Sequence, residues 1–310
     1  MRRGDVWKIR VRQGETACSL EGCCHAAPGA RYQDGPGSRP RVPHNRLAGV
    51  PVPLVPGPAA VGNCGQVKSP PRRKVPQPST AFTLEDQRQM TRARNYFAWQ
   101  SRLVLREAGR RVVEVGCGIG NFTGLLLDRE LVVALDPEAA CVERLRERYG
   151  PRENLQTLVC DTARPEFRDL AEFRPDSCLC VNVLEHIEDD AEALGAMASI
   201  LTPGGVIVLL VPAFEALYGP IDRNLGHYRR YRRGAIARLA ERAGLQVRKA
   251  HYLNSIGLAG WWMNAHVWKR EAQSDRQIAV FDRLLAPLLE RLEATVPPPF
   301  GQSLLAVLRK

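Results

Sequence analysis

The chain has 310 residues, of which 45% are hydrophobic and 25% are charged, and its formal net charge is +11. The basic excess lies in residues 1–80, which hold 13 Lys and Arg against 4 Asp and Glu, whereas residues 81–310 hold 31 against 29. The longer part is therefore nearly neutral, which argues against nucleic acid as a partner. We find no apolar run of about 18 uncharged residues and no signal-like run after Arg2 and Arg3, so we expect no membrane span, no secretory signal and a cytoplasmic location.

The first 80 residues contain 12 Pro and 10 Gly and show no helical or strand periodicity. Such a composition is typical of disordered sequence. We therefore predict a disordered, basic extension over residues 1–80 and one folded domain over residues 81–310. Four side chains of metal-ligand type cluster in the extension, but they lack the paired C-x2-C spacing of a zinc site, so no metal site is predicted there: Cys18, Cys23, Cys24 and His25.

Short apolar runs alternate with helical segments between residues 111 and 211. This alternation predicts a parallel sheet with helices on both faces, and the carboxyl ends of its strands are where ligands bind. The predicted strands are 111–115, 131–136, 155–160, 177–183 and 205–211, and the predicted helices are 83–109, about 120–129, 137–149, 165–172 and 187–200. Five cysteines in or beside these elements are expected in the core: Cys117, Cys141, Cys160, Cys178 and Cys180.

The remaining pattern predicts two more strands. One covers residues 246–253 after a helix over 233–243, and the other closes the chain at 303–309. A long helix over about 274–294 lies between them, and Pro287 should bend it.

A glycine-rich turn follows the first predicted strand, in the run Glu114-Val-Gly-Cys-Gly-Ile-Gly120. Glycine has no Cβ atom, so the backbone can turn sharply and approach a ligand closely. The spacing is G-x-G-x-G and not the G-x-G-x-x-G of dinucleotide sites. Glu114 would also repel a pyrophosphate, but it suits a cation such as an amino group or a sulfonium.

This run resembles the first motif of class I S-adenosylmethionine-dependent methyltransferases. Four later stretches resemble the following motifs of that family in the same order, so the resemblance covers roughly residues 92–310: residues 131–136, 155–161, 176–187 and 201–211. The resemblance implies an α/β fold, with a Rossmann-like seven-stranded, mostly parallel sheet, helices on both faces and an antiparallel C-terminal strand. It also implies S-adenosylmethionine as the cofactor.

By this resemblance, Glu114 and the glycine turn would face the amino-acid part of the cofactor. Asp136 would hold its ribose, and Asp161 its adenine. A helix cap or a solvated turn is the alternative role for each of these carboxylates. The full set of expected cofactor-binding residues is Glu114, Gly116, Cys117, Gly118, Gly120, Asp136, Pro137, Asp161, Thr162 and Asn182.

Two further places are candidates for acceptor chemistry. His186 follows the fourth strand and could act as a base or orient the acceptor, although we favour a structural role. In segment 217–233, His227 lies near Asp222 and could form a proton-accepting pair with it. Arginines there suit phosphate or carboxylate groups. A solvated loop with tyrosines as a lid is the alternative for this segment. The candidates are His227 and His186 as catalytic residues, with Asp222, Tyr228, Arg229 and Arg230 as acceptor-binding residues.

Segment 254–268 departs from small members of the family by its apolar composition, with Trp261, Trp262 and Trp268. We favour packing in the core, with an acceptor wall or a lipid-contacting surface as alternatives.

The resemblance predicts methyl transfer to a small-molecule or glycan/lipid-intermediate acceptor, with peripheral membrane contact left open. A protein or RNA methyltransferase is the first alternative. A non-catalytic member that binds the cofactor and acts through partners is the second.

Overall fold

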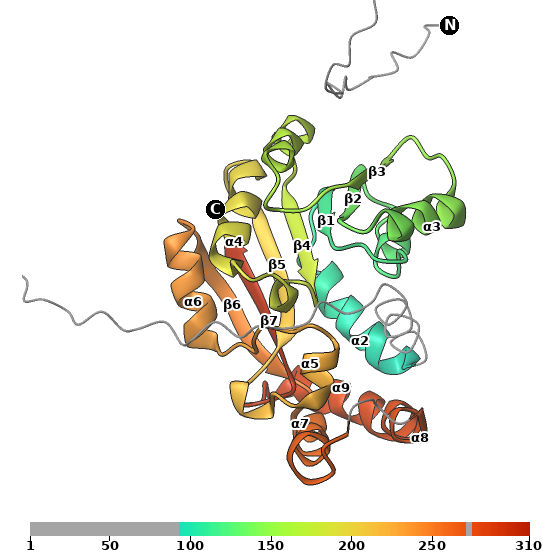
Figure 1. The fold of residues 1–310 in the computed structure, drawn as a ribbon, viewed down its shortest axis with the longest axis vertical. Helices are drawn as coiled ribbons and strands as arrows, with labels where there is room; N and C mark the ends of the chain where they lie inside the picture. Colours follow the sequence, from blue (N-terminus) through green and yellow to red (C-terminus); the bar gives the residue numbers. More distant parts are fainter. Residues whose placement is uncertain (1–92, 271–274) are drawn as a thin grey trace, which may run out of the picture. The chain divides into compact units, whose positions relative to one another are not determined.

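A seven-stranded sheet forms the centre of the computed structural model, which describes residues 93–270 and 275–310 (Figure 1). The strands are β1 (Arg111–Val115), β2 (Leu131–Asp136), β3 (Leu155–Val159), β4 (Ser177–Val181), β5 (Val206–Pro212), β6 (Gln246–Leu253) and β7 (Ser303–Arg309). Their order in the sheet is β3-β2-β1-β4-β5-β7-β6. Neighbours from β3 to β5 are parallel, whereas β7 is antiparallel to both β5 and β6. The predicted sheet, with its antiparallel C-terminal strand, is therefore confirmed.

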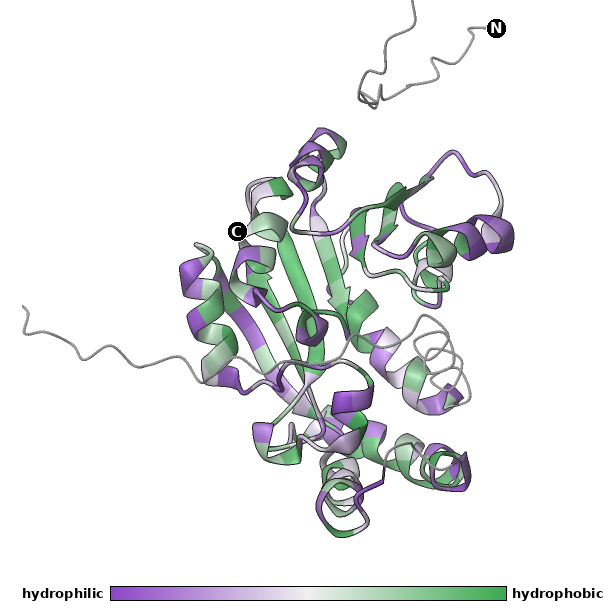
Figure 2. Cartoon of the chain, viewed as in Figure 1, coloured by the Kyte–Doolittle hydropathy of each residue, from purple (hydrophilic) through white to green (hydrophobic). Residues whose placement is uncertain are grey.

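Helices cover both faces of the sheet, as predicted. They are α2 (Arg94–Leu105), α3 (Ala139–Tyr149), α4 (Asp190–Ile200), α5 (Pro220–Asn224), α6 (Arg233–Arg242), α7 (Ser255–Trp262), α8 (Asp275–Val280) and α9 (Ala286–Thr295). Successive strand residues point to opposite faces, so Val113 packs with residues of α4 and α6, whereas Val112 packs with residues of α2, α3 and α9. Figure 2 shows the resulting hydrophobic strands at the centre. All five cysteines predicted for the core are buried.

Two predicted helices are only 3₁₀ segments in the structure, at Thr123–Leu125 and Pro165–Phe173. The first is fixed by tertiary contacts. The Thr123 hydroxyl donates to the Glu114 carboxylate at 2.6 Å, and a Cβ on Gly124 would lie 2.3 Å from the Tyr149 hydroxyl oxygen. Local helical propensity is therefore overridden just after the glycine turn.

The long helix predicted over 274–294 is interrupted. α8 continues into a π-helical turn at Phe281–Leu285, and α9 then begins with Pro287 in its first turn. Proline has no N–H to donate to the preceding turn, which accounts for the wider turn at the predicted bend. The helix predicted over 83–109 is described from Arg94 and ends at Leu105.

The tryptophan-rich segment forms α7 and a π-helical turn at Met263–Val267. Trp261 is 9% exposed and packs with Leu217 and Ile221, but Trp262 and Trp268 are 48% and 47% exposed. The prediction of core packing is therefore correct for Trp261 and wrong for the other two.

The predictions made for residues 1–80, including the cysteine and histidine cluster, lie outside the described residues, as do residues 83–92 of the first predicted helix. Within residues 93–270 and 275–310, no helix is both long enough and apolar enough to span a bilayer.

Candidate active site

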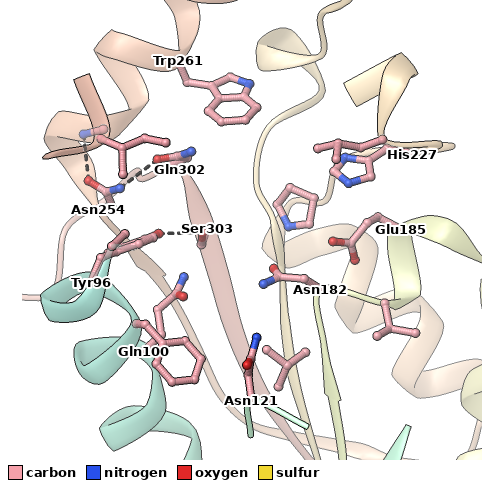
Figure 3. Close-up of a pocket in the computed structure, with 18 of the residues that line it drawn as sticks. Tyr96, Gln100, Asn121, Asn182, Glu185, His227, Asn254, Trp261, Gln302 and Ser303 are labelled. Carbon is pink, nitrogen blue, oxygen red and sulfur yellow. Dashed lines mark hydrogen bonds between the residues drawn. The ribbon is translucent and has the colours of Figure 1, made fainter. Parts of the chain in front are cut away.

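A cavity of about 1040 Å³ lies at the carboxyl ends of the parallel strands. On one side it is lined by the glycine turn after β1, by Asp136 at the end of β2 and by Asn182 after β4. Residues of α2, α7 and the C-terminal part of the chain close the other side. Figure 3 shows Glu185 and His227 on one wall and Tyr96 and Gln100 on the opposite one. This is the sheet edge at which the sequence predicted the ligand site.

The glycine turn packs closely against neighbouring backbone. The N–H groups of Gly116 and Cys117 both donate to the Leu135 carbonyl, at 2.8 and 2.9 Å. Gly116 has a φ of +72°, and a Cβ there would lie 2.4 Å from Cγ2 of Val183. Only glycine fits this position without strain, because both the backbone angle and the available space exclude a side chain.

Glu114, at the end of β1, places a buried carboxylate beside the turn. Burial raises its pKa to about 8, although the hydrogen bond from the Thr123 hydroxyl opposes the shift. A cation placed in the cavity near this group would favour its ionised form.

Asp136 lines the cavity and also orders the turn. One carboxylate oxygen accepts from the Gly118 N–H at 2.9 Å, and the other accepts from the Glu138 N–H at 3.0 Å. Burial raises the pKa of Asp136 in spite of these bonds. The carboxylate therefore closes the turn that leads into α3, which has no side-chain cap, and it remains at the cavity wall.

The other expected cofactor residues divide into three groups. Cys117, Pro137 and Asn182 line the cavity with Glu114 and Gly116. Gly118 and Gly120 shape the turn through their positive φ values of 53° and 82°. Asp161 and Thr162 lie outside the lining of the cavity that the described residues form, and Asp161 accepts from the Ala163 N–H, as in a solvated turn.

The candidate acceptor residues His186 and His227 come together, although 41 positions separate them in the sequence. Their ring centroids are 4.6 Å apart at an interplanar angle of 82°. His186 ends the short 3₁₀ turn η3 (Leu184–His186), and His227 follows α5. The Tyr228 N–H donates to the Glu185 carbonyl at 2.8 Å, which joins the two segments.

The predicted pair of Asp222 and His227 is present. Nδ1 of His227 lies 2.9 Å from Oδ1 of Asp222, and the same oxygen accepts from Nε of Arg230 at 2.8 Å. The other oxygen of Asp222 accepts from the Gly219 N–H at 2.9 Å. Asp222 is fully buried, so it positions His227 and does not reach the cavity as the predicted acceptor contact would require.

Burial alone would raise the pKa of Asp222, but the hydrogen bond from His227 and the charge of Arg230 outweigh it and hold the pKa below its usual value. Burial lowers the pKa of His186 to about 3, with a smaller contribution from His227. Burial raises the pKa of Glu185 to about 7, although His227 opposes the shift.

The predicted anion contacts have other partners. Arg229 forms an ion pair with Asp190 at 3.0 Å and lies outside the cavity lining, as does Tyr228. Arg230 lines the cavity, but it pairs with Asp222 and stacks on the Trp261 ring with 4.8 Å between Cζ and the ring centroid. Tyr231, which the alternative interpretation of this segment places in a lid, is only 2% exposed and belongs to the core.

Five polar residues on the opposite wall were not among the predicted site residues. The Tyr96 hydroxyl lies 3.3 Å from the Ser303 hydroxyl, and the Asn254 amide donates to Gln302 at 2.8 Å (Figure 3). The only signal for them in the sequence was that Asn254 follows a strand directly, at a position where it caps α7. The five residues are Tyr96, Gln100, Asn254, Gln302 and Ser303.

A family model described as a methyltransferase domain matches residues 85–250, which is more than half of the chain. A curated relative from Mycolicibacterium smegmatis, named "Probable S-adenosylmethionine-dependent methyltransferase", is 32% identical over 154 residues, or 47% of this chain and 56% of that protein. The tRNA (carboxymethyluridine(34)-5-O)-methyltransferase ALKBH8 of Mus musculus is 32% identical over 36% of this chain and 16% of its own length. A ubiquinone biosynthesis O-methyltransferase of Alkalilimnicola ehrlichii is 30% identical over 32% of this chain and 40% of its own length.

The matched region thus spans about half the length, or less, of these curated relatives. Among solved structures, the methyltransferase in a complex with the Haloferax volcanii Trm112 methyltransferase activator has the same fold, with a TM-score of 0.52 and 19% identity over 74% of this chain and 96% of that one. Together with the glycine turn and the acidic residues at the ends of β1 and β2, the family match shows that the chain belongs to the class I S-adenosylmethionine-dependent methyltransferases.

Proposed function

We propose that this chain transfers a methyl group from S-adenosylmethionine to a small-molecule or glycan/lipid-intermediate acceptor. The observation that carries the proposal is that one cavity is lined both by the strand-end residues Glu114, Asp136 and Asn182 and by the group of Glu185, His186 and His227. The volume of this cavity, about 1040 Å³, lies at the upper limit for ligand sites. This size supports a site that holds the cofactor and an acceptor at the same time.

The strand-end residues suit this cofactor. S-adenosylmethionine supplies an electrophilic methyl group on a positively charged sulfur. The carboxylate of Glu114 complements positive charge, and the carboxylate of Asp136 can accept hydrogen bonds from ribose hydroxyls. The absence of a side chain at Gly116 lets the turn pack against Val183 beside the strand end. We therefore assign these residues to cofactor binding.

The opposite part of the cavity suits an acceptor with an apolar portion. Ile256, Trp261, Phe281 and Leu285 contribute to its lining. The arginines nearest to the histidines are already paired with Asp190 and Asp222, which weakens the case for a phosphate-rich chain. These contacts favour a small or lipid-like acceptor over RNA, which is the substrate named for the tRNA-methylating relative.

His227 is the residue that we propose to promote loss of the acceptor proton. With the cofactor bound, a lone pair of the acceptor atom would form the new bond to the methyl carbon, the electron pair of the carbon–sulfur bond would stay on sulfur, and the acceptor proton would pass to Nε2 of His227. Asp222 fixes the His227 ring through Nδ1, which leaves Nε2 free to act toward the cavity. His186, 4.6 Å away by ring centroids, occupies the competing position.

A label-transfer assay tests this function. The full chain and methyl-labelled cofactor are incubated with cell extract separated into small-molecule, lipid, RNA and protein fractions. We expect label in the small-molecule or lipid fraction, and His227→Ala should lower turnover by about 10²–10⁴-fold while cofactor affinity stays nearly unchanged. Exposed His266, which bonds the Ala216 carbonyl, provides the matched control as His266→Ala.

Label in RNA or protein would replace the proposed acceptor with the first alternative. Cofactor binding without label in any fraction would favour the non-catalytic alternative. Loss of turnover in His186→Ala with a silent His227→Ala would reverse the roles of the two histidines.

A further inference from the structure

Three side chains of metal-ligand type converge on one wall of the cavity. One ligand atom from each of Glu185, His186 and His227 lies within 4.8 Å of the other two. We propose that these three residues bind one divalent first-row transition-metal ion. Two imidazole nitrogens and one carboxylate oxygen form a donor set that suits zinc, iron, cobalt or manganese.

The spacing of these atoms is close to that of a formed site. Ligands bound at about 2.0–2.2 Å from one ion lie at most about 4.4 Å from each other. Atoms that lie within 4.8 Å therefore need only small side-chain rotations to reach a common ion. The residues come from η3 and from the loop after α5, which the hydrogen bond from the Tyr228 N–H to the Glu185 carbonyl holds together.

One ring nitrogen of His227 is already fixed by a second group. Nδ1 of His227 lies 2.9 Å from the Asp222 carboxylate. Metal-binding histidines in proteins show this arrangement, because a carboxylate or carbonyl on one nitrogen orients the ring and leaves the other nitrogen for the metal. Asp222 is held in turn by Arg230 and by the Gly219 N–H.

A second observation, separate from the spacing of the three residues, indicates a missing ligand at Glu185. Its side chain is buried, with 1% exposure for the residue, and Oε2 has no hydrogen-bond partner. Figure 3 shows this carboxylate directed into the cavity below His227. Glu114, Asp136 and Asp222, the other buried carboxylates at this edge, all accept hydrogen bonds. A buried carboxylate oxygen without a donor is costly, and a bound cation would satisfy it.

Three protein ligands leave coordination positions open, which is typical of catalytic metal sites and not of structural ones. The role of the ion rests on the proposed function, which places the acceptor beside these residues. An acceptor oxygen bound in an open position would lose its proton more easily, because the positive charge lowers the pKa of a coordinated hydroxyl. His227 would then assist proton loss as a metal ligand.

Cobalt(II) titration of the full, chelator-treated chain tests the inference without cofactor or acceptor. We expect one saturable cobalt site per chain with weak visible bands from nitrogen and oxygen ligands. Glu185→Gln and His227→Ala should each weaken cobalt binding at least about tenfold. His251→Ala on β6 is the matched control and should leave binding unchanged. Circular dichroism and cofactor titration of the same samples check that each variant is folded.

Cobalt affinity that is the same in Glu185→Gln, His227→Ala and the parent chain would overturn the inference. An intense thiolate charge-transfer band that persists in both variants would also overturn it, because the metal would then sit on cysteines. Methyl transfer that survives chelation, with no saturable cobalt site, would overturn the metal site and leave the proposed function standing. Saturable cobalt binding to the three residues in a chain that transfers no methyl group would support the site and remove the proposed function.

Discussion

The buried carboxylates at the sheet edge differ in their hydrogen-bond and charge partners, and therefore in their pKa. Asp222 accepts from His227 and Arg230, and its pKa is lowered despite burial. Glu114 accepts from one neutral hydroxyl, so burial dominates and raises its pKa to about 8. Asp222 therefore holds its charge through protein partners, whereas Glu114 is mostly protonated near pH 7 until a cation approaches. This difference agrees with a positioning role for Asp222 and a ligand-binding role for Glu114.

The raised pKa of Glu114 predicts that cofactor affinity increases with pH. A cationic ligand favours the ionised carboxylate, so its binding must release the proton that the free protein holds below about pH 8. Between pH 6 and pH 7.5 the affinity for S-adenosylmethionine should therefore rise, by about 30-fold at most, because the limit is tenfold per pH unit. Calorimetry in buffers of different ionisation enthalpy measures both the affinity and the proton release.

Glu114→Gln is the control for that experiment, because it keeps the shape of the side chain and cannot titrate. Its affinity should be nearly independent of pH over the same interval. A parent chain with a flat pH profile, or a variant with the parent's slope, would contradict the role given to Glu114.

At the level of elements, local pattern predicted the parallel strands well because each is a short, mostly apolar run between turns, as Leu131–Asp136 is. It failed where tertiary contacts decide the conformation, as in the 3₁₀ turn at Thr123–Leu125. The glycine turn and the pair of Asp222 and His227 are local in sequence and were found. The polar residues of the opposite cavity wall were not predicted, because residues that contact each other there are far apart in the sequence. Tyr96 and Ser303, for example, are separated by 207 positions.

Gly116 and Gly150 provide a test of the turn geometry. Both have positive φ, at 72° and 63°, but a Cβ on Gly116 would lie 2.4 Å from Val183, whereas nothing lies within 4 Å of a Cβ on Gly150. Gly150→Ala should cost about 1–3 kcal/mol of unfolding free energy, because its φ of 63° and ψ of −172° lie in a region that almost only glycine adopts. Gly116→Ala should cost more and should also weaken cofactor binding.

Denaturant unfolding and cofactor titration of both variants measure these effects. Adding Val183→Ala to Gly116→Ala should recover part of the loss, because it removes the clashing methyl groups. Equal stability and equal cofactor affinity in the two glycine variants would contradict the close packing of the turn against the loop after β4.

Along the chain, the excess of basic residues and the exposed apolar side chains of the described residues lie in different parts. Residues 81–310 are nearly neutral, with 31 basic against 29 acidic side chains, whereas the preceding 80 residues hold 13 against 4. Large apolar side chains that are about half exposed or more gather toward the C-terminal part of the described chain: Trp262, Val267, Trp268, Leu284, Leu292 and Val296. This distribution favours an acceptor with an apolar part over a polyanion.

We propose that residues 1–80 do not contribute to cofactor binding, because their content of 12 Pro and 10 Gly and their lack of periodicity are typical of sequence without a packed core. A chain that starts at Thr80 should therefore unfold cooperatively and bind S-adenosylmethionine with the affinity of the full chain. Thermal unfolding and calorimetry check both points. If this shortened chain is unfolded, or binds markedly less tightly, the first 80 residues belong to the functional domain.

If the strand-end residues at this sheet edge bind S-adenosylmethionine, calorimetric titration of the parent chain and of Asp136→Ala should give clearly different affinities. The parent should bind one cofactor molecule per chain. Asp136→Ala should bind it about 10- to 150-fold more weakly, which corresponds to the loss of about 1.5–3 kcal/mol from a charged hydrogen-bond partner. Asp136→Asn keeps one acceptor oxygen and should lie between the two. Equal affinity in Asp136→Ala and the parent, or no binding by the parent, would contradict the assignment of these residues to cofactor binding.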